Sequence, residues 1–412
     1  MYSCIRKQYA TLIFPFVLPD LQVPNCCGRV ESQSVERITQ RPPSQPRQVS
    51  IQPIPIDPDY ADYAYLIDKF LEDDPIEPEK SEYKALKDLD QSKHVLKFGA
   101  DAANKHEHRK LNRYVNIYPY DFNRIKLQTA ILGSDYINGS HITFSQSDDD
   151  LCPTKRIFDG GNVKPFNFSK FCNISFLAAQ GPLPSSSAHF WQAVYENDVD
   201  IIVMLTKLKE GSSGPGPGAT KCTQYWPEVS EKSITVGNFE ITILEETEPR
   251  PEITKRTFSV KGGETTNFNV EKRVTQLHYV GWPDYGVPEE DDHLINLVKQ
   301  VRYIIQSDKN KISKREKFMV LAHCSAGVGR TGTFIAMYQL MDQIEEMFQT
   351  KYKQCDDKNR YIDIFNTVLF LRSKRVEMVQ SWAQYRYLYK SVAAYAKQIK
   401  AMNEKVEDDY VI

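Results

Sequence analysis

A cysteine and an arginine near residue 324 are spaced so that they can act together on a phosphate ester. They enclose five residues, two of them glycine, in the order Cys324, Ser325, Ala326, Gly327, Val328, Gly329, Arg330. Glycines let the backbone wrap tightly, so that successive N–H groups point into one concavity that binds anions. Such a concavity favours a thiolate over a thiol, and the planar arginine fork fits two phosphate oxygens. We therefore predict a nucleophilic cysteine in a phosphate-binding loop.

The segments on either side of this loop have patterns suited to holding it in place. Residues 318–323, FMVLAH, form an apolar run typical of a buried strand. Residues 334–348 carry apolar residues at helical spacing, which predicts a helix with a broad buried face. This helix begins near Arg330, so its positive dipole end adds to the anion site. Without this context, a cysteine and an arginine at this spacing are more often a core cysteine beside a turn.

The string HCSAGVGRTG (323–332) strongly resembles the signature of the protein tyrosine phosphatase family, whose members are Cys-based and tyrosine-specific. Other stretches resemble the same family in the expected order: LNRYVNIYPYD (111–121), SDYINGS (134–140), FLAAQGPLP (176–184), FWQAVYEND (190–198), KCTQYWP (221–227), GWPDYGVP (281–288) and MVQSWAQYRY (378–387). The resemblance covers roughly Ser81 to Lys400. It implies an enzyme without metal or cofactor that dephosphorylates phosphotyrosine-containing proteins through a covalent phosphocysteine.

The resemblance also implies the residues that act in the first chemical step. Cys324 attacks phosphorus, while Arg330 and the loop amides hold the equatorial oxygens. Asp284 is implied as the general acid that protonates the tyrosine leaving group. Trp282 and Pro283 form the hinge of a lid that closes over substrate. An isolated Trp-Pro-Asp would instead be interpreted as a solvated turn.

Five more residues match family positions that serve the second step or support the loop. Gln380 and Gln384 position the water that hydrolyses the phosphocysteine. Thr331 donates a hydrogen bond to the sulfur and helps it leave. His323 orients the loop and tunes the thiol, although a histidine beside a strand is more often structural. Glu210 locks the arginine guanidinium, and the alternative is one more exposed glutamate before a loop.

The entrance to the expected pocket both matches the family and departs from it. Tyr114 matches the aromatic wall that makes the pocket too deep for phosphoserine; the alternative is a core tyrosine in a mixed strand. Asn116 stands where many members carry an aspartate that binds peptide amides. Leu111 replaces a usual lysine and is expected to loosen the rim.

Glu377 is the third departure, since it stands where the family usually has glycine. Glutamate there is expected to crowd the entrance and to repel acidic peptides. The alternative is that Glu377 faces solvent and pairs with Arg375 or Lys374.

Apolar runs and alternating segments predict an α/β (α+β) fold, a single large domain with a twisted mixed central sheet flanked by helices. The expected strands, besides 318–323, are 199–206, 233–242 and 273–280, and a further helix is expected over 381–402.

Composition divides the chain into three segments. Residues 1–80 are rich in proline, glutamine and serine, which predicts a mostly disordered segment with one short helix near 63–71. We expect this segment to offer contacts to adaptor proteins. Residues 81–400 are expected to form the catalytic domain and 401–412 a tail.

Bulk properties exclude several classes of protein. A net charge of −2 leaves no basic excess for binding nucleic acid. The eight cysteines are sparse and form no C-x-x-C pair, which argues against a disulfide framework or a zinc site and favours a reducing, cytoplasmic location. No apolar run reaches the roughly 18 residues that indicate a membrane span. Membrane association through the N-terminal segment, by palmitoylation of Cys26 and Cys27, is the alternative.

Two other functions compete with an active tyrosine phosphatase. A pseudophosphatase would bind phosphotyrosine without turning it over, but such domains usually lose the nucleophile, the general acid or the glutamine, and all are present here. A dual-specificity enzyme is disfavoured by the Tyr114 motif and by the large domain.

Overall fold

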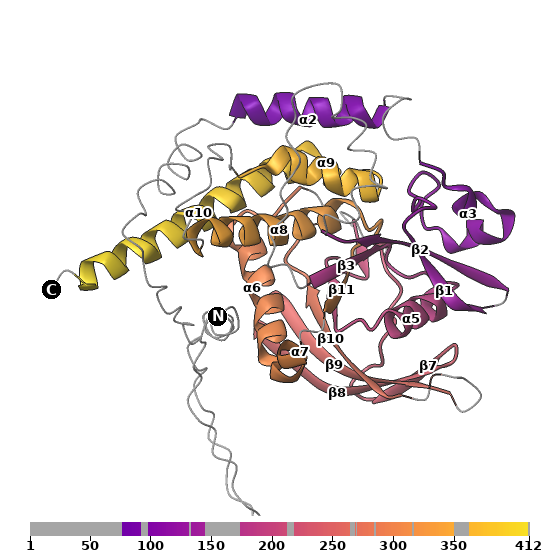
Figure 1. Ribbon diagram of the computed structural model, residues 1–412. Helices are drawn as coiled ribbons and strands as arrows, with labels where there is room; N and C mark the ends of the chain where they lie inside the picture. The colour runs from indigo at the N-terminus through magenta and orange to yellow at the C-terminus, as the bar shows by residue number, and fades with distance from the viewer. Residues whose placement is uncertain are drawn as a thin grey trace, which may run out of the picture. The chain divides into compact units, whose positions relative to one another are not determined.

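A nine-stranded mixed sheet forms the centre of the structure, a computed structural model (Figure 1). It describes residues 76–91, 98–131, 133–144, 174–211, 218–263, 268, 270–283, 286–314, 317–349 and 362–410. In sheet order the strands are β1 (Arg124–Ile131), β2 (Ser134–Ile142), β3 (Ile174–Ala179), β11 (Phe318–His323), β4 (Ile201–Met204), β10 (Lys272–Tyr279), β9 (Ile253–Gly262), β8 (Phe239–Arg250) and β7 (Ser233–Val236). Strands β5 (Lys209–Glu210) and β6 (Ala219–Thr220) form a small second sheet. The α/β prediction is confirmed.

The four central strands, β3, β11, β4 and β10, are parallel. Their register places His323, the last residue of β11, opposite both Ala179 and Met204. Chain segments that leave the carboxyl ends of neighbouring parallel strands meet at one edge of the sheet, where open α/β sheets bind ligands. Four such segments meet here, beginning at Gln180, Leu205, Val280 and Cys324.

Helices cover both faces of the sheet. They are α2 (Ile76–Gln91), α3 (Asp101–Asn104), η3 (His106–Leu111), α5 (Ser187–Glu196), α6 (Asp292–Ser307), α7 (Lys309–Lys314), α8 (Gly329–Gln349), α9 (Ile364–Lys374) and α10 (Trp382–Tyr410). Side chains alternate along a strand, so neighbouring residues of β3 pack against helices on opposite faces of the sheet. Phe176 packs edge-on against Phe334 of α8, whereas Leu177 joins the core cluster of Phe190 and Trp191 from α5.

Two predicted elements differ from the structure. Residues 233–242 were expected to form one strand, but Gly237 adopts a φ of +60° and turns the chain back, so β7 and β8 form a hairpin. The last helix runs through position 401 to Tyr410, past the predicted start of the tail. The helix expected near 63–71 lies outside the described residues. No helix in the described ranges combines the length and apolarity needed to cross a membrane.

The described residues between 61 and 398 form one compact unit, and the described part of the site lies within it. The described end of α10, residues 399–410, groups with a second unit whose other residues lie outside the described ranges.

Deleting residues 1–60 should leave the melting temperature within about 3 °C of that of the full chain and the activity nearly unchanged, because this segment is predicted to add no core. Thermal unfolding and aryl phosphate turnover provide the test. A deletion through residue 91 is the matched control, since it also removes α2. Glu82 of α2 accepts hydrogen bonds from Tyr385 (2.6 Å) and Tyr389 (2.5 Å), so this longer deletion should lower stability clearly. A large loss from the shorter deletion would mean that the predicted domain boundary is wrong.

Candidate active site

The loop between β11 and α8 wraps around the sulfur of Cys324. This side chain is 5% exposed, and the backbone N–H of Gly327 donates to its Sγ at 3.3 Å. Gly327 has a φ of +73°, and a Cβ there would lie 2.1 Å from the carbonyl oxygen of Ala179. Only glycine fits this position. The absence of a side chain lets the loop approach the end of β3, and the backbone N–H of Gly327 then points at the sulfur.

Arg330 lies at the start of α8 in a bidentate ion pair with Glu210. Its Nη1 is 2.6 Å from Oε1, and its Nη2 is 3.0 Å from Oε2. The Glu210 side chain is 4% exposed and also accepts from Thr206 Oγ1 (2.9 Å) and from the N–H of Lys207 (3.2 Å). A guanidinium whose two terminal nitrogens both bond a buried carboxylate, itself held by further hydrogen bonds, has a fixed orientation. The structure thus places Glu210 against Arg330, as the family resemblance implied.

The segment after β10 contacts the same arginine. Nη2 of Arg330 donates to the carbonyl oxygen of Pro283 at 3.1 Å, and its guanidinium lies 6.0 Å from the Trp282 ring centre. Trp282 is 1% exposed, and its indole N–H donates to the carbonyl of Gly286 at 3.2 Å, which closes the turn on itself. Asp284 lies outside the described residues.

His323 is fully buried behind the loop, and burial lowers its pKa to about 3, so it is neutral. Its Nδ1 lies 3.3 Å from the carbonyl oxygen of Cys324, which can only accept, so Nδ1 carries the proton. Nε2 then accepts from the Tyr225 hydroxyl at 2.8 Å, and that hydroxyl accepts from Gln276 at 2.8 Å. This chain of bonds fixes the backbone at Cys324. Tyr225 was not singled out from the sequence, although it lies within the KCTQYWP stretch.

Three polar side chains expected to serve the second step lie around the loop. Thr331 is fully buried, and its Oγ1 has no hydrogen-bond partner within the described residues. Gln384 lies against Gly329, where a Cβ would come within 2.8 Å of its amide nitrogen. Its Oε1 accepts from the backbone N–H of Gln380 at 3.0 Å. The side chain of Gln380 is exposed and donates to Glu377 at 2.7 Å.

Glu377 therefore bonds neither of the cations considered for it. Lys374 is 5% exposed and lies 5.2 Å from the Phe370 ring centre, and Arg375 is fully buried among other acceptors. Glu377 itself has a φ of +56°, a left-handed conformation that favours glycine. No local pattern of residues indicates the bond between Glu377 and Gln380.

Tyr114 is half-buried in the segment after η3, rather than in a strand. Its hydroxyl lies 2.8 Å from Ser325 Oγ, which donates to the carbonyl of Lys221 at 3.0 Å. The tyrosine ring is thereby attached to the rim of the loop. Asn116 is exposed, as a residue that meets a peptide must be, whereas Leu111 is 4% exposed and packs in a small core with Ala103 and Tyr136. Leu111 is thus a core residue.

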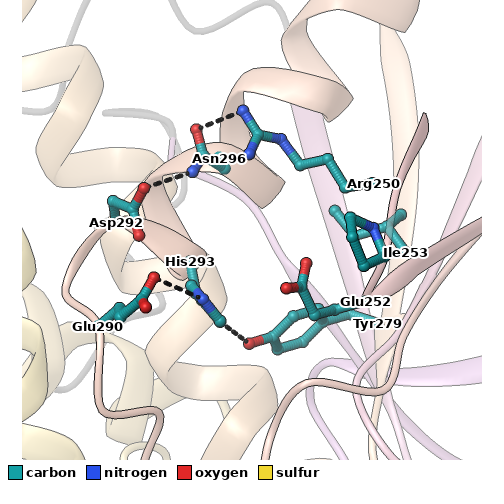
Figure 2. Close-up of a pocket in the computed structure, with 9 residues that line it drawn as sticks. Arg250, Glu252, Ile253, Tyr279, Glu290, Asp292, His293 and Asn296 are labelled. Atoms are coloured by element: carbon teal, nitrogen blue, oxygen red, sulfur yellow. Dashed lines mark hydrogen bonds and ion pairs between the residues drawn. The ribbon is translucent and has the colours of Figure 1, made fainter. Parts of the chain in front are cut away.

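A polar pocket of about 110 Å³ lies at the base of the segment that carries Trp282 (Figure 2). Tyr279, which ends β10, bonds His293 Nδ1 at 2.9 Å, and His293 Nε2 lies 3.1 Å from Glu290. These bonds tie together the two ends of residues 280–289. Atoms of Glu290, Asp292 and His293 that could ligate a metal ion lie within 4.8 Å of one another. Both ring nitrogens of His293, however, already make hydrogen bonds or ion pairs within the protein.

Comparison with known proteins agrees with this geometry. A family model described as protein-tyrosine phosphatase matches residues 108–394. Receptor-type tyrosine-protein phosphatase eta of Gallus gallus is 36% identical over 79% of this chain and 19% of its own length. Receptor-type tyrosine-protein phosphatase alpha of Homo sapiens is 32% identical over 71% and 30%. Phosphatidylinositol phosphatase PTPRQ of Rattus norvegicus is 34% identical over 69% and 10%.

A mixed sheet whose central strand β11 runs into the loop between Cys324 and Arg330, together with these matches, defines a protein-tyrosine phosphatase domain. The chain belongs to the protein-tyrosine phosphatase family. It spans between 10% and 30% of the lengths of the three relatives described above.

Proposed function

We propose that this chain hydrolyses phosphotyrosine in proteins through a covalent phosphocysteine on Cys324. The observation that carries the proposal is the Arg330–Glu210 pair beside a cysteine sulfur that accepts from a loop amide. A guanidinium already oriented before substrate arrives needs no reorganisation when charge develops on the phosphoryl oxygens. The same pre-oriented donors would also suit a domain that binds phosphotyrosine without hydrolysing it, so turnover must be tested directly.

In the first step, the thiolate of Cys324 attacks phosphorus in line, and an S–P bond forms as the P–O bond to tyrosine breaks. Asp284 gives its proton to the departing phenolate oxygen. Arg330 and the loop amides hold the three equatorial oxygens. The contact of Arg330 with the carbonyl of Pro283 supports this assignment, because it brings the residue before Asp284 to the phosphate clamp.

In the second step, water attacks phosphorus, the S–P bond breaks, and inorganic phosphate leaves. Asp284, now a carboxylate, takes the proton from this water. We assign the positioning of the water to Gln380 and Gln384, and the stabilisation of the departing sulfur to Thr331, whose buried hydroxyl has no partner within the described residues. Gln380 must first release its bond to Glu377 if its amide is to turn toward the loop.

Selectivity for tyrosine follows from the depth of the site. Cys324 is 5% exposed, and the Tyr114 hydroxyl is hydrogen-bonded to the next residue in the chain, Ser325. A phenyl spacer reaches such a sulfur more easily than the short side chain of phosphoserine. Since one relative is named a phosphatidylinositol phosphatase, phosphopeptides and a phosphoinositide should be compared in the same assay. We expect phosphotyrosine peptide to be the better substrate, and preferred turnover of phosphoserine or lipid would contradict the proposal.

Turnover of a small aryl phosphate should survive EDTA and be lost reversibly on mild peroxide treatment. The reason is that the proposed nucleophile is a thiolate, which oxidises readily, and no step uses a metal. Rates before and after chelation, and after peroxide followed by dithiothreitol, provide the test. Loss of activity with EDTA, restored by a divalent cation, would point to a different phosphatase chemistry. Absence of turnover with intact phosphopeptide binding would indicate a binding module instead.

Replacing Glu377 by glycine should lower KM for acidic phosphotyrosine peptides several-fold. The carboxylate lies beside Gln380 at the expected pocket mouth, where a like charge costs on the order of 1 kcal/mol in a partly desolvated cleft. Screening weakens this repulsion, so the gain should be larger at low salt than at high salt. Peptide kinetics at two ionic strengths provide the measurement. Glu377→Gln, which keeps the bulk and removes the charge, is the matched control, and an equal KM for all three proteins would contradict the effect.

We further propose that the domain acts in the cytoplasm on phosphotyrosine proteins and that residues 1–80 contact adaptors. The composition of that segment and the sparse cysteines support this proposal. Fractionation of cells that express the full chain, followed by capture on residues 1–80 and on a proline-to-alanine version of the same segment, provides the test. Equal capture by both versions would contradict the adaptor contacts.

A further inference from the structure

Arg375 is a fully buried cation that no step of the proposed mechanism uses. It caps the C-terminal end of α9 and reaches beneath the phosphate-binding loop. Its Nε donates to the carbonyl of Gly327 at 2.8 Å, and its Nη2 donates to the carbonyl of Ala326 at 3.0 Å. Nη2 also donates to Asn138 Oδ1 at 2.7 Å, and Nη1 lies 3.3 Å from Ser140 Oγ. Four of its five N–H groups are therefore satisfied by neutral acceptors.

Within the described residues, no carboxylate pairs with this guanidinium. Burial lowers the pKa of Arg375 to about 10, and negative charge on Tyr136, on Cys324 or on Tyr120 acts in the opposite direction. An unpaired buried cation is costly to a fold. A thiolate across the loop offsets part of that cost, and by the same interaction the cation stabilises the thiolate.

The two carbonyls that Arg375 holds belong to consecutive peptide units of the loop. In a trans peptide the C=O and the following N–H point in opposite directions. The carbonyl of Ala326 and the N–H of Gly327 belong to one such unit. Since the carbonyl points down to Arg375, the N–H points up, and it donates to Cys324 Sγ at 3.3 Å. Holding the Gly327 carbonyl turns the next N–H, that of Val328, to the same side.

The same arginine also connects the loop to the segment that carries Tyr114. Asn138, whose Oδ1 accepts from Arg375, donates through Nδ2 to Asn112 Oδ1 (2.9 Å) and to the carbonyl of Ile117 (2.8 Å). Asn112 and Ile117 lie on either side of Tyr114 in the chain. One buried side chain therefore fixes both the anion loop and, through Asn138, the wall of the pocket.

We propose that Arg375 is a positioning residue that orients the amides of the Cys324 loop from behind and stabilises the thiolate across it. This inference rests on the proposed function of that loop. It goes beyond that function by assigning a role to a second arginine, one that never touches substrate.

The test replaces Arg375 by methionine, which keeps length but loses charge and donors, and by lysine, which keeps the charge but lacks the planar fork that bonds several acceptors at once. The first readout is the pH midpoint of iodoacetate alkylation of the Cys324 peptide, followed by mass spectrometry. It needs no turnover and so stands apart from a failure of the proposed activity. We expect Arg375→Met to move the midpoint up by about one pH unit and to lower kcat/KM by about 100-fold or more. Arg375→Lys should move the midpoint less while still lowering kcat/KM.

Arg372→Met is the matched control, because Arg372 is equally buried but bonds the carbonyls of Met378 and Val379, both at 2.9 Å. It should cost similar thermal stability and leave the alkylation midpoint unchanged. An unchanged midpoint in Arg375→Met, or an equal shift in Arg372→Met, would overturn the proposal. If neither Arg375 variant folds, Asn138→Ala decides: it should raise KM and shift the midpoint slightly upward, and wild-type values for both would overturn the proposal.

Discussion

Cys324→Ser should lower turnover of phosphotyrosine peptide by about four to six orders of magnitude while leaving peptide binding nearly intact. The serine hydroxyl is not ionised at neutral pH, so the attacking group is lost, whereas Arg330 and the loop amides still hold the phosphate. Stopped assays of phosphate release, paired with fluorescence anisotropy of a labelled peptide, measure the two quantities separately.

Cys222→Ser provides the matched control, since Cys222 is the other described cysteine and is also buried. Burial raises its pKa to about 12, which keeps the thiol protonated at neutral pH. A serine there would retain a hydroxyl to donate to the carbonyl of Thr223, as the Sγ does at 3.2 Å. Activity near wild type in Cys324→Ser, or loss in Cys222→Ser alone, would contradict the assignment of the nucleophile.

Asp284→Ala should lower kcat for tyrosine phosphate by about 10²- to 10⁴-fold with little change in affinity. The phenolate of tyrosine is a poor leaving group unless it is protonated. The leaving group of an aryl phosphate with an acidic phenol needs no proton, so the decrease in kcat on that substrate should be far smaller. The ratio of the two losses is the diagnostic quantity, and it is obtained from kcat on both substrates.

Asp291→Ala, further along the same segment and close to the start of α6, is the control for a general effect of removing a carboxylate. This variant should have a kcat within about twofold of wild type on both substrates. Equal losses on both substrates in Asp284→Ala would assign Asp284 to structure instead. Because Asp284→Ala is expected to bind substrate without hydrolysing it at an appreciable rate, this variant is suited to capturing phosphotyrosine proteins from cells.

The sheet and the loop could be predicted because their signals are local. The run FMVLAH forms β11 over the same residues, and the glycine-rich string that follows forms the tight loop before α8. The hairpin at 233–242 was missed because alternation continues on both sides of Gly237, and only a positive φ at that glycine turns the chain. Local patterning does not report a backbone reversal at a single glycine.

Contacts between distant segments could be predicted less well. Glu210 was assigned from resemblance alone, since nothing in the residues around it shows that Arg330 lies 2.6 Å away. Arg375 was considered only as a surface partner for Glu377, because charged residues are rarely fully buried. Its burial depends on carbonyls of the loop at 326–327 and on Asn138 of β2, which only the folded chain brings together.

A rapid-quench experiment with ³²P-labelled phosphotyrosine peptide tests the phosphocysteine most directly. Turnover is stopped in acid within milliseconds, and the labelled peptide is located by mass spectrometry. We predict that one phosphate is attached to Cys324 before inorganic phosphate appears. In Gln380→Ala this species should accumulate, because the attacking water is less well positioned. Steady release of phosphate with no label on the Cys324 peptide in either protein would contradict the covalent mechanism.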